Sequence, residues 1–556
     1  MKKNPFTQKI VPAQAITMTD WLSMKPYKQP IHGYDIYYLQ QCQVVFRQLN
    51  KEETWFKFYG LSQTQLKELT CQLVSYFEDY INDIGIWNAF VDTNEALYGY
   101  PLPFYDVSEH DKTYINIEDI AFLIWHYLTK YSDEEYLINP DHDTIMGLAK
   151  TLFAHFENIM DDSLAIDFYE AFFTIKDKAD YFAFKNKMEW FTTESYLLGV
   201  DFRRKLENEK AKLMQHVKND PEGAAYVPIV LYNLLEVYLY QKRSSFSALN
   251  GPEWFAKVAK CSEQSKAEIL DLTYWIDGKF ILKERQKEHL IFEHLLTNIT
   301  YKARLDSFKN NKNLKPSDNV ASQMHLIRWD GEYMLSGMMV GEEVTPLSLK
   351  QYKASALKTP WILSDKAISE MYKHTQIMYE AFVEFFEGEL VTFDTYPQLS
   401  AANEAFLDFY KKKANHKMDK SDERLKKYRE LLGKSLTTRI DNPFDKDAKS
   451  FAMFFIKDVS SYTFKNAKQT IALLKAPTLT PDEEAYLFVD FANGLIPPVC
   501  AYLLKKYGSK NLRFPTIDNK MDVVKYLPFF HRMNSPEEFD RAYPLMTLVS
   551  TEDLDK

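Results

Sequence analysis

Glycine is scarce in this chain, and its scarcity limits the folds that the chain can form. Only 16 of the 556 residues are glycine, whereas average usage is about 7%. Glycine allows tight turns and lets the backbone approach phosphate groups closely. Runs of Lys, Glu, Leu, Tyr and Phe with amphipathic spacing take its place. We therefore expect a mainly α fold of irregular, multiple helices, without the glycine-rich loops of common nucleotide-binding enzymes.

Capping signals predict where several helices begin. Ser62 precedes Gln65 by three residues, and Thr480 precedes Glu483 by three, which is the spacing of a capping box. The stretch Ile120–Tyr131 is apolar nearly all round and predicts a buried helix. The most apolar run, Ala224–Tyr240, contains a proline, an asparagine and a glutamate, so we interpret it as a buried core helix rather than a membrane span.

One segment departs from the helical pattern. Asp330-Gly331 separates two runs of β-forming residues, and a two-residue Asp-Gly link of this kind predicts a β-hairpin. Asp277-Gly278 resembles a second such turn, although it equally suits the cap of a helix ending near Trp275. The polar stretch 306–319 has the composition of a linker.

These signals predict two helical lobes joined by a polar linker and a small β-hairpin. The expected ranges are an N-terminal arm over 1–60, a helical lobe over 61–305, the linker and hairpin over 306–345, and a C-terminal helical lobe over 346–556.

Charge and cysteine content narrow the class of protein. The formal net charge of −10 disfavours general adhesion to nucleic acid or anionic lipid. The four cysteines are widely scattered, which is typical of a reducing compartment and gives no zinc-site spacing. The first residues lack the apolar core of a signal peptide. We expect a soluble, cytoplasmic protein with no cofactor and no bound metal.

A few residues resemble the ligands of metal-dependent enzymes. His110, His142 and Asp143 imitate the His and His-Asp ligands of helical phosphohydrolases, which hold a metal that activates water. Because Asn139-Pro140 places His142 in a loop, an N-terminal cap by Asp141 or Asp143 is the plainer interpretation.

Two further patterns also resemble metal-ligand sets of enzymes. Glu288-His289 and Glu293-His294 fit the charged face of one helix. Pro481-Asp482 with 518–520 imitates the metal-binding set of some nucleases, although Asp482 also suits a helix-capping turn.

The stretch Lys411–Arg439 is strongly basic. It carries eleven Lys and Arg residues against four acids, and the aromatic Tyr428 lies within it. Cations that track a phosphate backbone and aromatics that stack on bases are typical of single-stranded nucleic-acid binding. Lys426, Lys427 and Arg429 are the candidate polyanion-binding residues, and a solvated helical hairpin is the alternative. Gly433-Lys434-Ser435 lacks the earlier glycine of a P-loop.

Several blocks together resemble a known family. They are YFEDYINDIGIWNAF (76–90), PLPFYD (101–106), YINIEDIAFLIWHYL (114–128) with the NPDHDTI that follows, and MHLIRWDGEYMLSG (324–337). The chain resembles uncharacterised proteins of Bacteroides-type bacteria that are catalogued only as a domain of unknown function, of the 3843 type. The resemblance spans about residues 76–341, with FANGLIPPVCAYL (491–503) as a further block. It implies a bacterial cytosolic origin and no activity, cofactor or catalytic residue.

The sequence thus leaves the catalytic residues open. We expect a non-enzymatic helical interaction or scaffold protein that binds a protein or nucleic-acid partner through the 411–439 basic stretch. The alternative is a metal-dependent phosphohydrolase or nuclease that uses His110, His142 and Asp143.

Overall fold

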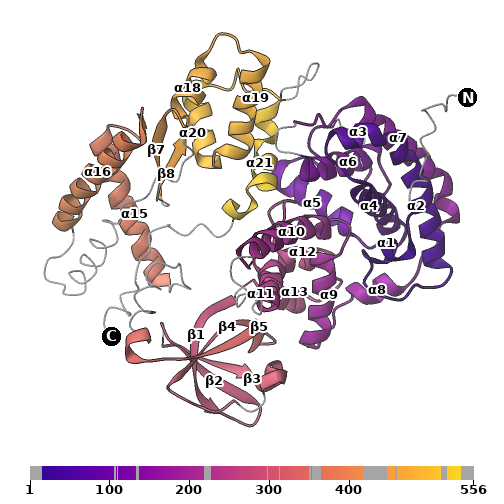
Figure 1. The fold of residues 1–556 in the computed structure, drawn as a ribbon, viewed down its shortest axis with the longest axis horizontal. Coiled ribbons are helices and arrows are strands. Elements are labelled where there is room, and N and C mark those ends of the chain that lie inside the picture. Colours follow the sequence, from indigo (N-terminus) through magenta and orange to yellow (C-terminus); the bar gives the residue numbers. More distant parts are fainter. Residues whose placement is uncertain are drawn as a thin grey trace, which may run out of the picture. The chain divides into compact units, whose positions relative to one another are not determined.

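The protein is described by a computed structural model whose described residues are 59% helical (Figure 1). The described residues are 15–105, 108, 110–132, 137–217, 227–273, 275–296, 298–311, 314–349, 352, 365–417, 448–457, 460–514 and 522–539. The prediction of a mainly α protein is therefore confirmed, although the β content is larger than a single hairpin.

The chain divides into two compact units between Thr273 and Tyr274. Unit 1 is helical, and unit 2 contains a β-barrel and a mixed helical and sheet region. The predicted linker, 306–319, belongs to the connection between the third and fourth strands of the barrel.

Unit 1 is built mainly from α-helices. They are α1 (Met18–Leu22), α2 (Tyr34–Lys51), α3 (Glu53–Phe58), α4 (Gln63–Ile81), α5 (Ile86–Tyr98), α6 (Ile117–Tyr131), α7 (Asp143–Ile159), α8 (Phe168–Phe173), α9 (Tyr181–Thr193), α10 (Leu198–Val217), α11 (Val227–Tyr240), α12 (Gly251–Val258) and α13 (Glu263–Asp271).

Local chemistry explains where these helices begin and which ones are buried. Ser62 caps α4, and the reciprocal bonds of the predicted capping box with Gln65 are both present. Helix α6 buries all residues from Asp119 to Leu128, which confirms the predicted buried helix. It packs against α4 and α7, so its apolar surface is covered on several sides.

Helix α11 differs from its prediction. Its C-terminal residues Tyr238–Tyr240 are buried, but Val230 is 45% exposed and Tyr232 is 41% exposed. The prediction of a wholly buried helix is therefore wrong for its first half, where exposed residues alternate with half-buried ones. Within the described ranges, no helix combines the length and the apolar character that a membrane crossing requires.

The first part of unit 2 is a closed five-stranded barrel. Its strands are β1 (Trp275–Arg285), β2 (His289–His294), β3 (Thr300–Arg304), β4 (Val320–Trp329) and β5 (Glu332–Glu343), with a short helix η3 (Leu305–Asn311) after β3. The order around the barrel is β1-β2-β3-β5-β4 (Figure 1). The long strand β1 pairs with β2 and β4, and β3 closes the barrel by a parallel pairing with β5. Because β4 returns to lie beside β1, the connectivity is a Greek key.

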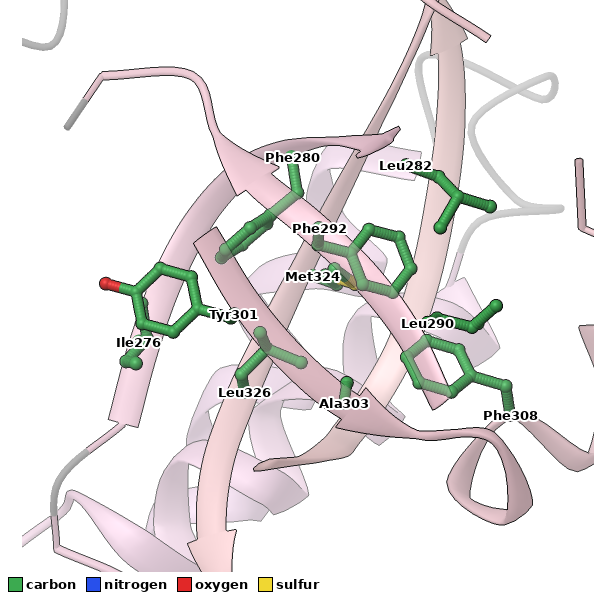
Figure 2. Packing of buried hydrophobic residues seen from close by; sticks show 10 residues of the cluster. All are labelled: Ile276, Phe280, Leu282, Leu290, Phe292, Tyr301, Ala303, Phe308, Met324 and Leu326. Atoms are coloured by element: carbon green, nitrogen blue, oxygen red, sulfur yellow. The ribbon is translucent and has the colours of Figure 1, made fainter. Parts of the chain in front are cut away.

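Apolar side chains fill the barrel interior (Figure 2). Phe280 from β1, Phe292 from β2 and Leu326 from β4 are fully buried, and Phe308 from η3 is 1% exposed. The rings of Phe292 and Phe308 stack with centroids 5.4 Å apart. Helix η3 thus contributes a side chain to the interior core, which is packed rather than hollow.

The barrel corrects two predictions made from the sequence. Residues 288–294 were expected to form one charged helix, but His289–His294 is strand β2, with Leu290 and Phe292 facing inward. Asp277-Gly278 was expected to form a turn or a helix cap, but both residues lie inside β1 and pair with His325 and Met324 of β4. In both places, long-range pairing overrides a local signal.

The predicted hairpin at Asp330-Gly331 is confirmed. Trp329 and Glu332 face each other across the turn, which joins β4 to β5. The φ angles are 49° for Asp330 and 74° for Gly331. Two positive φ angles in a two-residue loop define a type I′ turn.

Replacing Gly331 with valine is expected to lower the stability of the barrel by about 1–2 kcal/mol, because a β-branched residue is strained at positive φ. No atom outside the turn would touch the added Cβ, so the strain is in the backbone alone. The measurement is the free energy of amide opening in β4 and β5 by hydrogen exchange. The Gly331→Asn variant is the control, since asparagine tolerates this conformation. Equal protection in Gly331→Val and the parent chain would contradict the turn assignment.

The remainder of unit 2 combines helices with a small sheet. Its elements are α15 (Asp365–Phe386), β6 (Leu390–Phe393), α16 (Tyr396–Lys417), β7 (Phe451–Ile456), β8 (Ser460–Lys465), α18 (Ala467–Lys475), α19 (Pro481–Val489), η4 (Asp490–Gly494), α20 (Pro497–Tyr507), α21 (Val523–Asn534) and η5 (Pro536–Phe539). The sheet has the antiparallel order β6-β7-β8. Phe382 of α15, Phe406 of α16 and Phe455 of β7 belong to one buried cluster.

Candidate functional site

The predicted metal ligands do not come together. His110 Nε2 lies 2.9 Å from the carboxylate of Asp119. His142 is the N-terminal cap of α7, where its ring nitrogen accepts the amide of Thr144 at 3.1 Å, and Asp143 is the first residue of that helix. In the part of the chain that the structure describes, no group of three or more His, Cys, Asp or Glu side chains is arranged to hold a metal ion.

The other residues that resemble enzyme motifs have structural roles wherever the structure describes them. Asp482 lies in the first turn of α19, between the residues Thr480 and Glu483 that form the capping box. Asp518, the second half of the nuclease-like pattern, lies outside the described residues. His289 Nε2 lies within hydrogen-bonding distance, 2.7 Å, of the carboxylate of Glu332 of β5.

The basic candidates are outside the described part of the chain. Lys426, Lys427 and Arg429 fall in the gap 418–447, together with the P-loop-like Gly433-Lys434-Ser435. Of the basic stretch, the structure places the residues up to Lys417, which continue helix α16.

A cysteine and histidine near each other in unit 2 do not form a nucleophilic pair. Cys500 Sγ lies 3.6 Å from His531 Nε2. That nitrogen is 2.7 Å from the carbonyl oxygen of Phe491, so it must carry a proton and donate it there. Burial raises the pKa of the Cys500 thiol well above its usual range. A neutral thiol without an available base is inert.

The rim of the barrel holds a polar pocket of about 490 Å³. Lys287 and Glu288 come from the β1–β2 loop, Arg304 ends β3, and Glu332 begins β5 directly after the Asp330-Gly331 turn. Arg285, His289, Leu305 and Asp306 complete the lining. The pocket therefore lies where the β1–β2 loop, the end of β3 and the β4–β5 turn meet.

Charges of both signs line this barrel-rim pocket. Arg304 pairs with Asp306 and lies 3.8 Å from Glu332, which also pairs with His289. Lys287 is exposed. The paired groups fix the rim, and the ammonium group of the lysine is accessible to solvent.

A second pocket, of about 410 Å³, lies in unit 1 and has aromatic walls. Its lining includes the rings of Tyr76 and Tyr80 from α4, Trp87 from α5 and Tyr114 from the loop before α6. Tyr76 meets Trp87 edge-on with centroids 5.3 Å apart, and Tyr80 meets Tyr114 in the same way at 5.9 Å. We call this site the aromatic pocket.

A buried carboxylate holds one wall of the aromatic pocket in place. Asp79 accepts the backbone amides of Gly85 at 2.7 Å and Trp87 at 2.8 Å, and the hydroxyl of Tyr196 at 2.7 Å. It thereby caps the N-terminus of α5 from the preceding helix. Burial raises the pKa of Asp79 to about 6, although these three donors act in the opposite direction.

A second buried carboxylate lies behind Tyr76. Asp119 accepts the Tyr76 hydroxyl at 2.7 Å, the Asn116 amide at 3.1 Å and His110 at 2.9 Å. Burial is the largest influence on the pKa of His110 and lowers it, but the hydrogen bond to Asp119 and the negative charges of Asp119, Glu118 and Glu95 together raise the pKa above its ordinary value. These bonds fix the position of the Tyr76 ring at the edge of the pocket.

Sequence reasoning missed the aromatic pocket, although part of its signal was present. Eight of its eleven lining residues lie within the block 76–90, which carries aromatic side chains on both sides of Gly85 and acidic side chains before it. The remaining lining residues, Lys112, Thr113 and Tyr114, come from a loop 22 residues or more beyond that block. Their approach depends on how α6 packs on α4, which local patterns do not encode.

The comparisons with known proteins agree with the resemblance seen in the sequence. No curated protein and no solved structure matches the chain. The model of the family described as "Protein of unknown function (DUF3843)" matches residues 15–285, a range that begins earlier than the resemblance and ends at the last residue of β1. The part of the chain that contains the aromatic pocket is therefore similar to the DUF3843 family.

Proposed function

We propose that the chain is a non-enzymatic interaction protein that binds single-stranded nucleic acid through its barrel. The supporting observation is the barrel-rim pocket, where the β1–β2 loop, the end of β3 and the β4–β5 turn meet. Five-stranded Greek-key barrels that bind oligonucleotides or oligosaccharides use the β2–β3 face with these same two loops. A shared topology indicates only where a ligand could lie, and the charged side chains of the pocket supply the chemistry of phosphate binding.

The cations of the rim suit a phosphate backbone. Arg285 and Lys287 come from the β1–β2 region and Arg304 from the end of β3, where Arg304 also faces the carboxylates of Asp306 and Glu332. Arginine and lysine side chains contact phosphate oxygens in most protein–nucleic acid complexes. Since the chain as a whole carries a net charge of −10, a nucleic acid would be confined to local basic regions.

The basic stretch 411–439 is a second contributor in this proposal. Its eleven cations against four acids form the most basic segment of the sequence. Lys426, Lys427 and Arg429 would add phosphate contacts beyond those of the barrel rim. The predicted alternative, a metal-dependent phosphohydrolase or nuclease, is not favoured by the positions of His110 and His142.

Fluorescence anisotropy with labelled single-stranded DNA and RNA tests this function on the full chain. We expect affinity to fall steeply between about 50 mM and about 200 mM salt, because each neutralised phosphate releases counterions. The variant Lys287→Ala/Arg304→Ala should weaken binding to all sequences and reduce the salt slope by about 1 for each lost contact. Replacing Lys426, Lys427 and Arg429 with glutamate should weaken it further.

The matched control is Lys150→Ala/Lys510→Ala, which removes the same charge from exposed lysines outside both regions. This control should bind like the parent chain. If the control lost as much affinity for nucleic acid, binding would depend on the overall charge of the protein and not on these two regions. Absence of binding at micromolar protein in low salt would reject the proposal.

A further inference from the structure

The aromatic pocket of unit 1 has the walls of a cation-binding site. Tyr76, Tyr80, Trp87 and Tyr114 are among the residues that line a space of about 410 Å³. The face of an aromatic ring carries negative electrostatic potential, and several faces around one space attract an ammonium or guanidinium group. A volume of this size suits a small molecule or a single side chain.

The carboxylates that line the pocket also favour a cationic ligand. The carboxylates of Asp79 and Asp83 belong to its lining. Asp79 is buried and bonded to backbone amides, so it supplies a fixed negative charge when ionised. The Asp83 carboxylate is 88% exposed and lies 3.9 Å from Lys260, which leaves most of its surface open to a ligand.

One cation also lines the pocket, but other carboxylates neutralise it. Lys112 Nζ lies 2.8 Å from Asp92 and 2.5 Å from Glu95. These two acids outnumber it, so the local balance around Lys112 is negative. An anionic ligand would have to displace one of those carboxylates before it could use the lysine.

We propose that the aromatic pocket binds an organic cation, with an ammonium group held against the tyrosine and tryptophan faces and near the Asp83 carboxylate. The group comes either from a free small amine or from a lysine side chain of a partner protein, since both present the same chemistry. This inference concerns unit 1 alone and does not depend on nucleic-acid binding by the barrel.

Isothermal titration calorimetry of the full chain with choline tests the pocket directly. The comparison ligand is 3,3-dimethyl-1-butanol, which has the shape of choline without its charge. We expect choline to bind and the neutral alcohol to bind much more weakly, because only the cation interacts with the ring faces and carboxylates. A lysine-rich peptide and its acetylated form, titrated in parallel, distinguish a side-chain ligand from a free amine.

Two variants examine the two parts of the site. Tyr114→Leu keeps an apolar side chain and removes a ring face, so choline binding should weaken about 2-fold to 30-fold. Asp83→Asn removes one exposed charge and suits the positive φ of 48° at that position, so the fold should remain intact. Its expected loss is smaller, about 2-fold to 5-fold.

Matched controls separate the pocket from general effects. Asp330→Asn removes the same charge from another residue with positive φ, in the barrel turn, and Tyr232→Leu removes an exposed ring from α11. Both should bind choline like the parent chain. Equal affinity for choline and its neutral isostere would overturn the proposal, as would binding that Tyr114→Leu leaves unchanged in a folded protein. Binding of a neutral sugar in place of both cations would reassign the pocket to another ligand class.

Discussion

Replacing Lys25 with methionine is expected to lower the free energy of unfolding of unit 1 by about 3–5 kcal/mol. Lys25 and Glu78 form an ion pair in which both residues are only 1% exposed. The Lys25 ammonium also donates to Ser75 at 2.9 Å and lies 3.5 Å above the ring of Trp21. Without the lysine, the Glu78 carboxylate would remain buried without an opposite charge, which is far more costly than the loss of a surface pair.

The hydroxyl groups around Glu78 do not remove this cost. Tyr34 donates to Glu78 at 2.7 Å and Tyr169 donates at 3.1 Å. Neutral donors stabilise a carboxylate less than a cation at the same distance. Hydrogen exchange of amides in α2 and α4 measures the effect within unit 1, where a single denaturation curve of the whole chain would mix the two units.

Two further variants make the result interpretable. Lys25→Met/Glu78→Gln removes both charges, and its stability should recover most of the loss, because no charge stays buried alone. Lys28→Met breaks the exposed pair with Glu194, whose side chains are 72% and 35% exposed, and should cost less than about 1 kcal/mol. If the single and double Lys25 variants were equally unstable, packing rather than charge would explain the effect.

The sequence predicted features that depend on a few adjacent residues. The capping boxes at Ser62 and Thr480 need only a residue and its neighbour three positions on, and both are present. The hairpin at Asp330-Gly331 likewise depends on two residues that accept positive φ. Each of these signals involves residues no more than a few positions apart, so it can be interpreted without knowledge of distant contacts.

The barrel could not be recognised because its strands carry weak or misleading local signals. In β2, charged or titratable residues His289, Glu293 and His294 suggest a solvated helix face. Strand β2 exists because β1 and β3 pair with its two edges. Strand β3 was the better clue, since its polar and apolar residues alternate and its burial alternates with them.

The candidate sites were predicted least well. His110, His142 and Asp143 looked related by residue type, but each has a local structural partner or position instead. The aromatic pocket needed the approach of Tyr114 to the end of α4, which follows from the packing of α6. A sequence shows which chemical groups a chain carries, whereas only the tertiary structure shows which of those groups lie together in one site.

Replacing Phe292 with alanine is expected to destabilise the barrel by about 3–5 kcal/mol. Phe292 is fully buried, stacks on Phe308 at 5.4 Å and meets Phe280 edge-on at 6.5 Å (Figure 2). Its removal opens a cavity between side chains from β1, β2 and η3. A five-stranded barrel has a small interior, so the surrounding chain has little freedom to close that cavity.

Hydrogen exchange of peptides from 275–343 measures this loss, and peptides from unit 1 in the same experiment provide an internal reference. The same-strand control is Ile291→Ala, because Ile291 is half-buried on the opposite face of β2 and should cost much less. Phe292→Leu should lie between the two, since it keeps an apolar side chain of intermediate volume. If Phe292→Ala left the protection of β1, β2 and β3 unchanged, the ring would not be part of the barrel core. A graded loss in the order Ile291→Ala, Phe292→Leu, Phe292→Ala would show that interior volume, rather than strand propensity, stabilises the barrel.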